Sequence, residues 1–245
     1  MKQRLDQRLL ELGLAESREQ AQRLIMAGQI RVGGHPATKP GHLYPGDAVI
    51  ERVATERYVS RGGEKLEGAF RDFALNVMGK KCLDVGASTG GFTDCLLQHG
   101  AESVIALDVG RAQLHPRLRA DPRVTVIEGF NARYLTEGDL PYRPEIAVTD
   151  VSFISLTLIL PPMANVLVPG GEIVALIKPQ FEAGREHVGK GGVVRDSKVH
   201  ADVVAKIKDF GERELRLTCL GIVPSPLTGP AGNIEFLSHW RKPDH

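Results

Sequence analysis

The stretch KCLDVGASTGGFTD, residues 81–94, joins a short apolar segment to a glycine-rich turn and then to the start of a helical pattern. Glycine lets a backbone approach a ligand closely, and the free amides at a helix N-terminus attract polar and anionic groups. A plain tight turn between a strand and a helix would have the same outline. Asp108 ends the next apolar segment, 22 positions after Gly86, where an acid can accept hydrogen bonds from both hydroxyls of a ribose. The stretch therefore predicts a site for a nucleotide-like cofactor.

Apolar segments alternate with helical patterns on both sides of this turn. Uninterrupted apolar segments are typical of parallel strands that are buried on both faces. Repeated strand–helix units predict an α/β fold with a doubly wound, Rossmann-like sheet. The predicted strands are 81–86, 103–108, 124–128, 145–150, 171–178 and two final strands within 215–226 and 232–240, and the predicted helices include 90–99, 154–167 and 197–214.

The N-terminal part has a different pattern, with two short helices, a hairpin at Gly33-Gly34 and a closing strand, which predicts a small α+β domain. Residues 1–46 contain seven Lys and Arg against four Asp and Glu, although the whole chain has a net charge of only +1. This local excess favours a nucleic-acid partner. The predicted organisation is a small domain at 1–51, a linker at 52–60 and the α/β domain at 61–245.

Composition excludes several classes of protein. The three cysteines, Cys82, Cys95 and Cys219, are widely spaced, which argues against a disulfide framework or a zinc site. The N-terminus lacks the apolar core of a signal peptide, and no apolar run approaches the ~20 residues that cross a bilayer. We therefore expect a cytoplasmic protein without a metal or a membrane partner. The oligomeric state stays open, and a monomer is the simplest expectation.

Polar residues also mark the ends of predicted strands. Asp150 and Lys178 end two of them, and ligands bind at the carboxyl ends of parallel strands. Glu235 lies in the last predicted strand, and Lys65 opens the helix before the glycine-rich turn. A structural ion pair between Asp150 and Lys178, a solvated Glu235 and an exposed Lys65 would explain the four residues one by one.

Together these residues match a known arrangement, because the region 58–239 resembles the FtsJ-type RNA ribose 2′-O-methyltransferases. DVGASTGGFT is similar to the first motif of class I methyltransferases, whereas a nicotinamide site favours GxGxxG and position 88 is serine. The resemblance implies S-adenosylmethionine as the cofactor, with Asp84 orienting its methionine part and Asn131 near its adenine. The implied cofactor-binding residues are Asp84, Gly86, Ala87, Ser88, Thr89, Gly90, Gly91, Phe92, Asp108, Val109, Asn131 and Asp150.

The Lys-Asp-Lys-Glu tetrad of that family falls, in the same chain order, on Lys65, Asp150, Lys178 and Glu235. A ribose 2′-hydroxyl is a weak acid and must lose its proton as it attacks the sulfonium methyl. A lysine that neighbouring positive charge keeps close to neutrality can accept that proton, and a second lysine can stabilise the alkoxide. We predict Lys178 as the base, since it lies on a rigid strand beside the cofactor methyl.

Residues 4–51 resemble the small RNA-binding domain known from ribosomal protein S-four. The domain order, together with RYVSRGGEKL, TDVSFISL and IKPQFEAGREHVGKGGVVRD, is similar to the TlyA (hemolysin A) family. This resemblance implies 2′-O-methylation of cytidine in ribosomal RNA, and the short termini predict small-subunit RNA as the substrate. The loop 181–196 is either a lid over the target nucleotide or an ordinary exposed loop. The predicted RNA-binding residues are Arg4, Ser17, Arg18, Arg23, Arg31, Lys39, Arg61, Arg185 and Lys190.

Three other functions compete with this hypothesis. A non-catalytic ribosome-assembly factor would bind RNA through the same small domain, and only turnover would distinguish it. A membrane-lytic protein is disfavoured, because the sequence contains no spanning segment and only 5% aromatic residues. A dehydrogenase is disfavoured by Ser88 in the glycine-rich turn.

Overall fold

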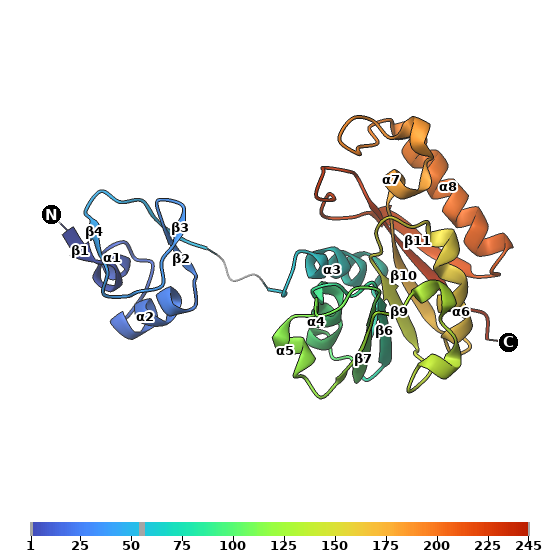
Figure 1. The fold of residues 1–245 in the computed structure, drawn as a ribbon, viewed down its shortest axis with the longest axis horizontal. Helices are drawn as coiled ribbons and strands as arrows, with labels where there is room; N and C mark the ends of the chain where they lie inside the picture. The colour runs from blue at the N-terminus through green and yellow to red at the C-terminus, as the bar shows by residue number, and fades with distance from the viewer. Residues whose placement is uncertain (1, 54–56, 245) are drawn as a thin grey trace. The chain divides into compact units, whose positions relative to one another are not determined.

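The computed structural model describes residues 2–53 and 57–244, and the chain divides into two compact units, Met1–Glu56 and Arg57–His245 (Figure 1). Each unit has its own hydrophobic core. Residues 57–60, which the sequence analysis assigned to the linker, belong to the second unit: the Tyr58 side chain is buried in its core, and the Val59 amide donates a hydrogen bond to Asp94 Oδ2 at 2.9 Å.

The first unit is a small α+β fold. Leu5, Leu9 and Ile25 are buried where two helices meet, as their helical spacing predicts. Ser17 caps the second helix by accepting a hydrogen bond from the Gln20 amide at 3.1 Å. The elements are β1 (Lys2–Arg4), α1 (Leu5–Glu11), α2 (Arg18–Met26), β2 (Ile30–Val32), β3 (His35–Pro36), β4 (Leu43–Pro45) and β5 (Ile50–Arg52). β2 pairs with β3 and β5, as the hairpin prediction requires, whereas the pairing of β1 with β4 was not predicted.

The second unit contains one seven-stranded sheet in the order β11-β12-β10-β9-β6-β7-β8. Its strands are β6 (Lys81–Val85), β7 (Ser103–Asp108), β8 (Val124–Glu128), β9 (Ile146–Thr149), β10 (Glu172–Ile177), β11 (Thr218–Pro224) and β12 (Phe236–Arg241). The first five are parallel, which confirms the predicted α/β fold and the position of each strand. β12 enters antiparallel between β10 and β11, an order that the sequence analysis did not predict.

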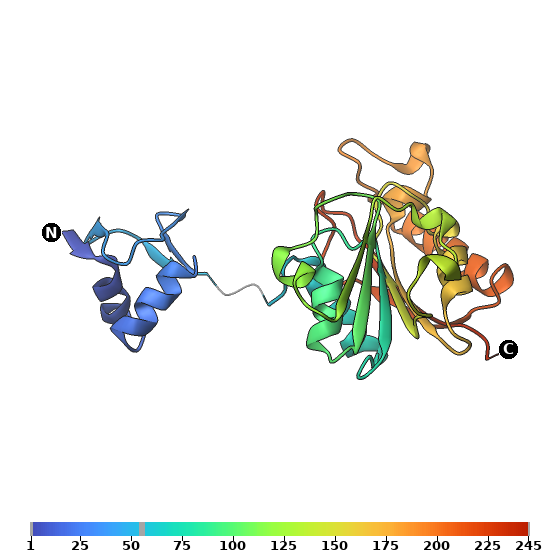
Figure 2. The same ribbon diagram turned by 60° about the horizontal axis from the view of Figure 1, so that its bottom comes forward.

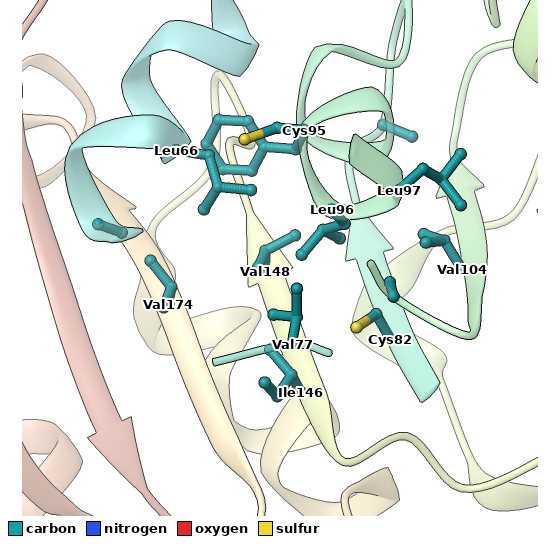
Figure 3. Close-up of a cluster of buried hydrophobic side chains, with 14 of the residues drawn as sticks. Leu66, Val77, Cys82, Cys95, Leu96, Leu97, Val104, Ile146, Val148 and Val174 are labelled. Atoms are coloured by element: carbon teal, nitrogen blue, oxygen red, sulfur yellow. The ribbon is translucent and has the colours of Figure 1, made fainter. Parts of the chain in front are cut away.

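Helices cover both faces of this sheet (Figure 2). The helices are α3 (Gly62–Phe73), α4 (Gly91–Gln98), α5 (Pro116–Arg119), α6 (Leu160–Val166), α7 (Pro179–Glu182) and α8 (Ser197–Arg213). α3 and α4 pack on one face, where Leu66, Leu96 and Val148 belong to one buried cluster (Figure 3). α6 and α8 pack on the other face, over residues such as Ile173. Because neighbouring residues of a strand alternate between the two clusters, the central strands are apolar throughout.

Two predicted elements differ from the structure. The predicted helix 154–167 is a 3-10 turn at Leu156–Leu158 followed by the shorter α6, because Pro161 and Pro162 suit only the first turn of an α-helix. Glu235 lies just before β12 rather than inside the strand.

Within the described ranges, no helix is both long and apolar enough to cross a membrane.

Candidate active site

The direction of the chain reverses between β6 and β9. β7 and β8 follow on one side of β6, whereas β9 and β10 lie on the other, so the loops after β6 and β9 leave the sheet at a topological switch point. Gly86 follows β6 with a φ of +80°, and a Cβ atom there would lie 2.9 Å from Val151 Cγ1 of the other loop. The two loops therefore meet closely, and only glycine fits at this position.

The glycine-rich turn also seats helix α4 against helix α3. A Cβ atom on Gly91 would lie 2.8 Å from the Gly63 amide nitrogen and 2.4 Å from Ser60 Oγ. Gly90 has a φ of +97° and faces Leu118. Ser88 adopts a left-handed φ of +50°. These glycines serve helix packing as well as ligand access, so both interpretations of the turn are physically sound.

Asp108 fixes the turn from the neighbouring strand. Its Oδ2 accepts a hydrogen bond from the Ser88 amide at 2.7 Å, and its Oδ1 accepts one from the Gly110 amide at 2.6 Å. Each carboxylate oxygen keeps a second lone pair, and the side chain lines a cavity at this edge. Asp108 can therefore still accept hydrogen bonds from a ribose.

Two adjoining cavities lie at the switch point. The larger, of about 500 Å³, is mainly apolar and includes Asp108, Val109, Phe130 and Asn131. The smaller, of about 240 Å³, contains Lys65 and Lys178 together with the predicted turn residues Ala87, Thr89, Gly91 and Phe92. Gly86, Ser88, Asp150 and Ser152 line both cavities. This arrangement suits an elongated molecule with an aromatic end in one cavity and a reactive group in the other.

The structure brings together the four residues of the predicted tetrad. Lys178 Nζ lies 2.5 Å from Asp150 Oδ1 and donates to Ser152 Oγ at 2.9 Å. Lys65 Nζ lies 2.6 Å from Glu235 Oε2 and 3.7 Å from Asp150 Oδ2. Asp150 thus bridges the two ammonium groups. The side chains of both lysines are only 9% exposed, so these are buried pairs whose geometry is closely determined.

Asp84 lies deeper than the resemblance implies. Within the described part of the chain, neither Asp84 nor Gly90 lines a cavity at this edge. Asp84 Oδ2 accepts a hydrogen bond from Thr93 Oγ1 at 2.7 Å, which joins β6 to α4. Burial raises the pKa of Asp84 to about 7, against the hydrogen bonds from Thr93, which lower it. A cofactor contact for Asp84 therefore stays a prediction.

Three residues of the site were missed by the sequence analysis. Ser152 Oγ accepts a hydrogen bond from the Lys178 ammonium, and Gln180 Nε2 donates one to Glu235 Oε1 at 3.1 Å. Phe153 is 90% exposed and lines the larger cavity. Ser152 and Gln180 each lie two positions after a tetrad residue, and this spacing is the one signal that the sequence offers for them.

The predicted RNA-binding residues are accessible, and some also have structural roles. Arg4 and Arg18 donate hydrogen bonds to the buried carboxylate of Asp6 at 2.8–3.1 Å, and the bond from Arg4 lowers the pKa of Asp6 far below its usual range. The other predicted contacts, Ser17, Arg23, Arg31, Lys39, Arg61, Arg185 and Lys190, are exposed. Their contact with RNA stays a prediction.

A third cavity, of about 590 Å³, lies elsewhere in the second unit. Its arginines are neutralised by adjacent acids: Arg71 pairs with Asp72 and Arg241 pairs with Glu172. None of the tetrad residues lines it within the described ranges. Size alone therefore does not make it the active site.

Glu67, Cys95 and His99 also cluster between α3 and α4. Burial alone would raise the pKa of Glu67, but hydrogen bonds from Tyr58, His99 and Arg57 lower it to about 2. Burial raises the pKa of the Cys95 thiol to about 12, which disfavours the thiolate that a metal requires. The cluster is best described as a hydrogen-bond network.

Comparison with known proteins identifies the family. The model of the FtsJ-like methyltransferases matches residues 58–242, which include the whole tetrad and the glycine-rich turn. The chain belongs to the FtsJ-like methyltransferase family. The S4 domain model matches residues 3–50, which is the first structural unit. The class I, Rossmann-like interpretation of the sheet is thereby confirmed, and the TlyA relatives described next confirm the resemblance to that family.

Several curated relatives match this chain over most of their length. A candidate rRNA methyltransferase of Bacillus subtilis, YqxC, is 52% identical over 99% of this chain and 86% of its own. The 16S/23S rRNA (cytidine-2′-O)-methyltransferase TlyA of Mycobacterium tuberculosis is 46% identical over 95% of this chain and 87% of its own. The 23S rRNA (cytidine-2′-O)-methyltransferase TlyA of Campylobacter jejuni is 35% identical over 78% of this chain and 73% of its own. A solved structure of a candidate hemolysin from Streptococcus thermophilus has 46% identity and a TM-score of 0.76, covering 99% of this chain and 89% of that one.

Proposed function

We propose that this protein transfers a methyl group from S-adenosylmethionine to the ribose 2′-hydroxyl of a cytidine in ribosomal RNA. The observation that carries the proposal is the junction of the two cavities, where Asp150 bridges Lys65 and Lys178 at the carboxyl edge of the sheet. The relatives named above support the choice of cytidine and of ribosomal RNA.

The residues at the switch point fit the cofactor. Asp108 would accept hydrogen bonds from its ribose, the apolar cavity with Phe130 and Asn131 would hold its adenine, and the turn at Gly86 would face its methionine part. When bound, S-adenosylmethionine supplies an electrophilic methyl group on its sulfonium sulfur. Because the two cavities join at Gly86 and Asp150, this arrangement aims the reactive end toward the lysines.

The tetrad supplies proton acceptance and charge stabilisation. Lys65 contacts two carboxylates, Glu235 and Asp150, which hold its nitrogen in a fixed position and suit it to stabilise the developing 2′-oxyanion. Lys178 contacts one carboxylate and a hydroxyl, so it is paired with fewer carboxylates and is the better candidate for the group that accepts the 2′-proton. Asp150 holds both nitrogens on the same side of the cavity, and positioning itself contributes to the rate.

The S4 domain would deliver the RNA. Its exposed Arg23, Arg31 and Lys39 are suited to phosphate contacts, which position a protein on RNA without selecting sequence. The sequence analysis predicted small-subunit RNA. The names of the two relatives argue against this choice, because both include 23S, the large-subunit RNA, and neither names 16S alone.

The first test is transfer of labelled methyl from S-adenosylmethionine to isolated 30S and 50S subunits. A 2′-O-methylated linkage resists alkaline hydrolysis, so we expect the label in alkali-resistant dinucleotides that contain cytidine. Label confined to 30S would support the small-subunit prediction, and label on 50S would contradict it. If neither subunit is labelled although both bind, the assembly-factor hypothesis replaces the enzyme.

Phe153 provides a prediction about how RNA is held. Its backbone has a φ of +63°, a conformation that is costly for a bulky residue, and its exposed ring lies 5.0 Å from the ring of Phe181. We expect Phe153→Ala to raise KM for RNA about tenfold, because stacking of a base on an aromatic ring contributes about 1–3 kcal/mol. Steady-state kinetics at saturating cofactor measures this change.

Phe153→Trp is the matched control, because it keeps an aromatic face, and its KM for RNA should stay close to that of the wild type. If Phe153→Ala instead weakens cofactor affinity and leaves KM for RNA unchanged, the ring serves the cofactor cavity that it lines.

A further inference from the structure

Gln180 lies beside the tetrad but does not line the two cavities of the site. It is in helix α7, two residues after Lys178, and its Nε2 donates to Glu235 Oε1 at 3.1 Å. Glu235 is almost fully buried, and its other oxygen, Oε2, accepts the hydrogen bond from Lys65 at 2.6 Å. The two carboxylate oxygens of Glu235 are therefore divided between Gln180 and Lys65. Within the described chain, Gln180 lines neither of the two cavities.

Two neighbours contact Glu235 Oε1, and of these Gln180 donates a hydrogen bond that fixes the orientation of the carboxylate. On another side the backbone of Gly229 lies so close that a Cβ atom there would be 2.5 Å from Glu235 Oε1. Gly229 is held in this place because its amide donates to the Asn233 carbonyl at 2.9 Å. The turn thus packs against Oε1 without donating a hydrogen bond to it, and the Gln180 amide is the donor that keeps Oε1 away from Lys65.

The other end of the Gln180 amide is unsatisfied. Gln180 Oε1 is buried and, among the residues that the structure describes, has no hydrogen-bond partner. A buried carbonyl without a partner lowers stability. An apolar side chain of similar size would avoid this cost but would leave the buried Glu235 Oε1 without its donor, so the two ends of the amide have opposite effects on stability.

We infer that Gln180 is a positioning residue for the methyl-transfer reaction: it orients Glu235, and through Glu235 it fixes the Lys65 ammonium relative to the target 2′-oxygen. The inference rests on the proposed function. Loss of the amide frees the carboxylate to rotate, and the position of the Lys65 ammonium becomes less closely determined. Small misplacements of a group that acts on a reacting atom reduce the rate of the chemical step.

The test replaces Gln180 by methionine, which keeps length and volume and removes both amide groups. We expect the single-turnover rate constant for methyl transfer to fall about tenfold. This is the difference that corresponds to one lost hydrogen bond to a charged group. KM for RNA and the affinity for S-adenosylmethionine should stay within about twofold. The melting temperature should change little, because the loss of the hydrogen bond to Glu235 and the removal of the buried Oε1 act in opposite directions. Activity should therefore fall without a matching loss of stability.

The matched control is Gln98→Met. Gln98 Nε2 also donates to a carboxylate, Asp94 Oδ1 at 3.0 Å, and to the Arg57 carbonyl at 2.9 Å. This variant should lower the melting temperature and leave kcat unchanged. A Gln180→Met variant that melts earlier with unchanged kcat, or that changes KM for RNA alone, would overturn the inference. Wild-type transfer is measured first, so failure of the proposed function is recognised separately, and the melting temperatures do not depend on turnover.

Discussion

Replacing Lys178 by methionine is expected to slow methyl transfer by about 10³-fold, because a general base typically contributes 10²–10⁴ in rate. Methionine keeps the apolar stem of the side chain and removes the nitrogen that lies 2.5 Å from Asp150 and 2.9 Å from Ser152. Single-turnover transfer to ribosomal RNA at saturating cofactor measures the chemical step directly. Cofactor affinity, measured by calorimetry, should change little, since Lys178 lines only the smaller cavity.

Lys198→Met is the matched control, because Lys198 is an exposed lysine in the first turn of α8, and its rate should equal that of the wild type. If Lys178→Met retains transfer within tenfold while Lys65→Met abolishes it, the two lysines exchange the roles assigned above. If both variants retain transfer, the tetrad is a structural ion-pair network and the mechanism is wrong.

Replacing Asp84 by asparagine should change how stability depends on pH. Burial raises the pKa of Asp84 from 3.8 to about 7. Between these values the folded protein holds a proton that the unfolded chain has released, so the free energy of unfolding falls as pH rises through this range. The full difference corresponds to about 4 kcal/mol at pH 8. Asp84→Asn carries no charge and should be more stable than the wild type at pH 8 and nearly equal to it at pH 4.

Chemical denaturation at both pH values checks this expectation. Glu214→Gln removes an exposed carboxylate and should leave the pH dependence unchanged. A variant at Asp84 that is destabilised more at pH 8 than at pH 4 would show that the ionised carboxylate stabilises the fold, contrary to the prediction.

The strands at the centre of the fold were predictable because each is a continuous apolar run. The edge of the sheet was not, since an antiparallel strand such as β12 leaves no local signal of which neighbours it joins. The length of α6 was overestimated, because the helical spacing of apolar residues continued through Pro161 and Pro162.

The candidate site shows the same contrast. Lys65, Asp150, Lys178 and Glu235 could be chosen by matching a family motif, and their contacts agree with that choice. Gln180 and Ser152 could not, because a single amide or hydroxyl has no periodicity, and only the folded chain shows what it contacts. For Asp84 the motif position implies a ligand contact, which stays a prediction, and only the folded chain shows its hydrogen bond from Thr93.

The insertion of β12 between β10 and β11 has a consequence for biosynthesis. Glu235 joins Lys65 across 170 positions of sequence, and it precedes a strand whose place in the sheet lies between two strands made earlier. On the ribosome, the helix that carries Lys65 and the strands before Asp150 and Lys178 emerge first and can begin to fold. The carboxylate that holds Lys65 arrives only with the last strand. Nascent chains are therefore expected to be inactive until Glu235 and β12 have emerged from the ribosome.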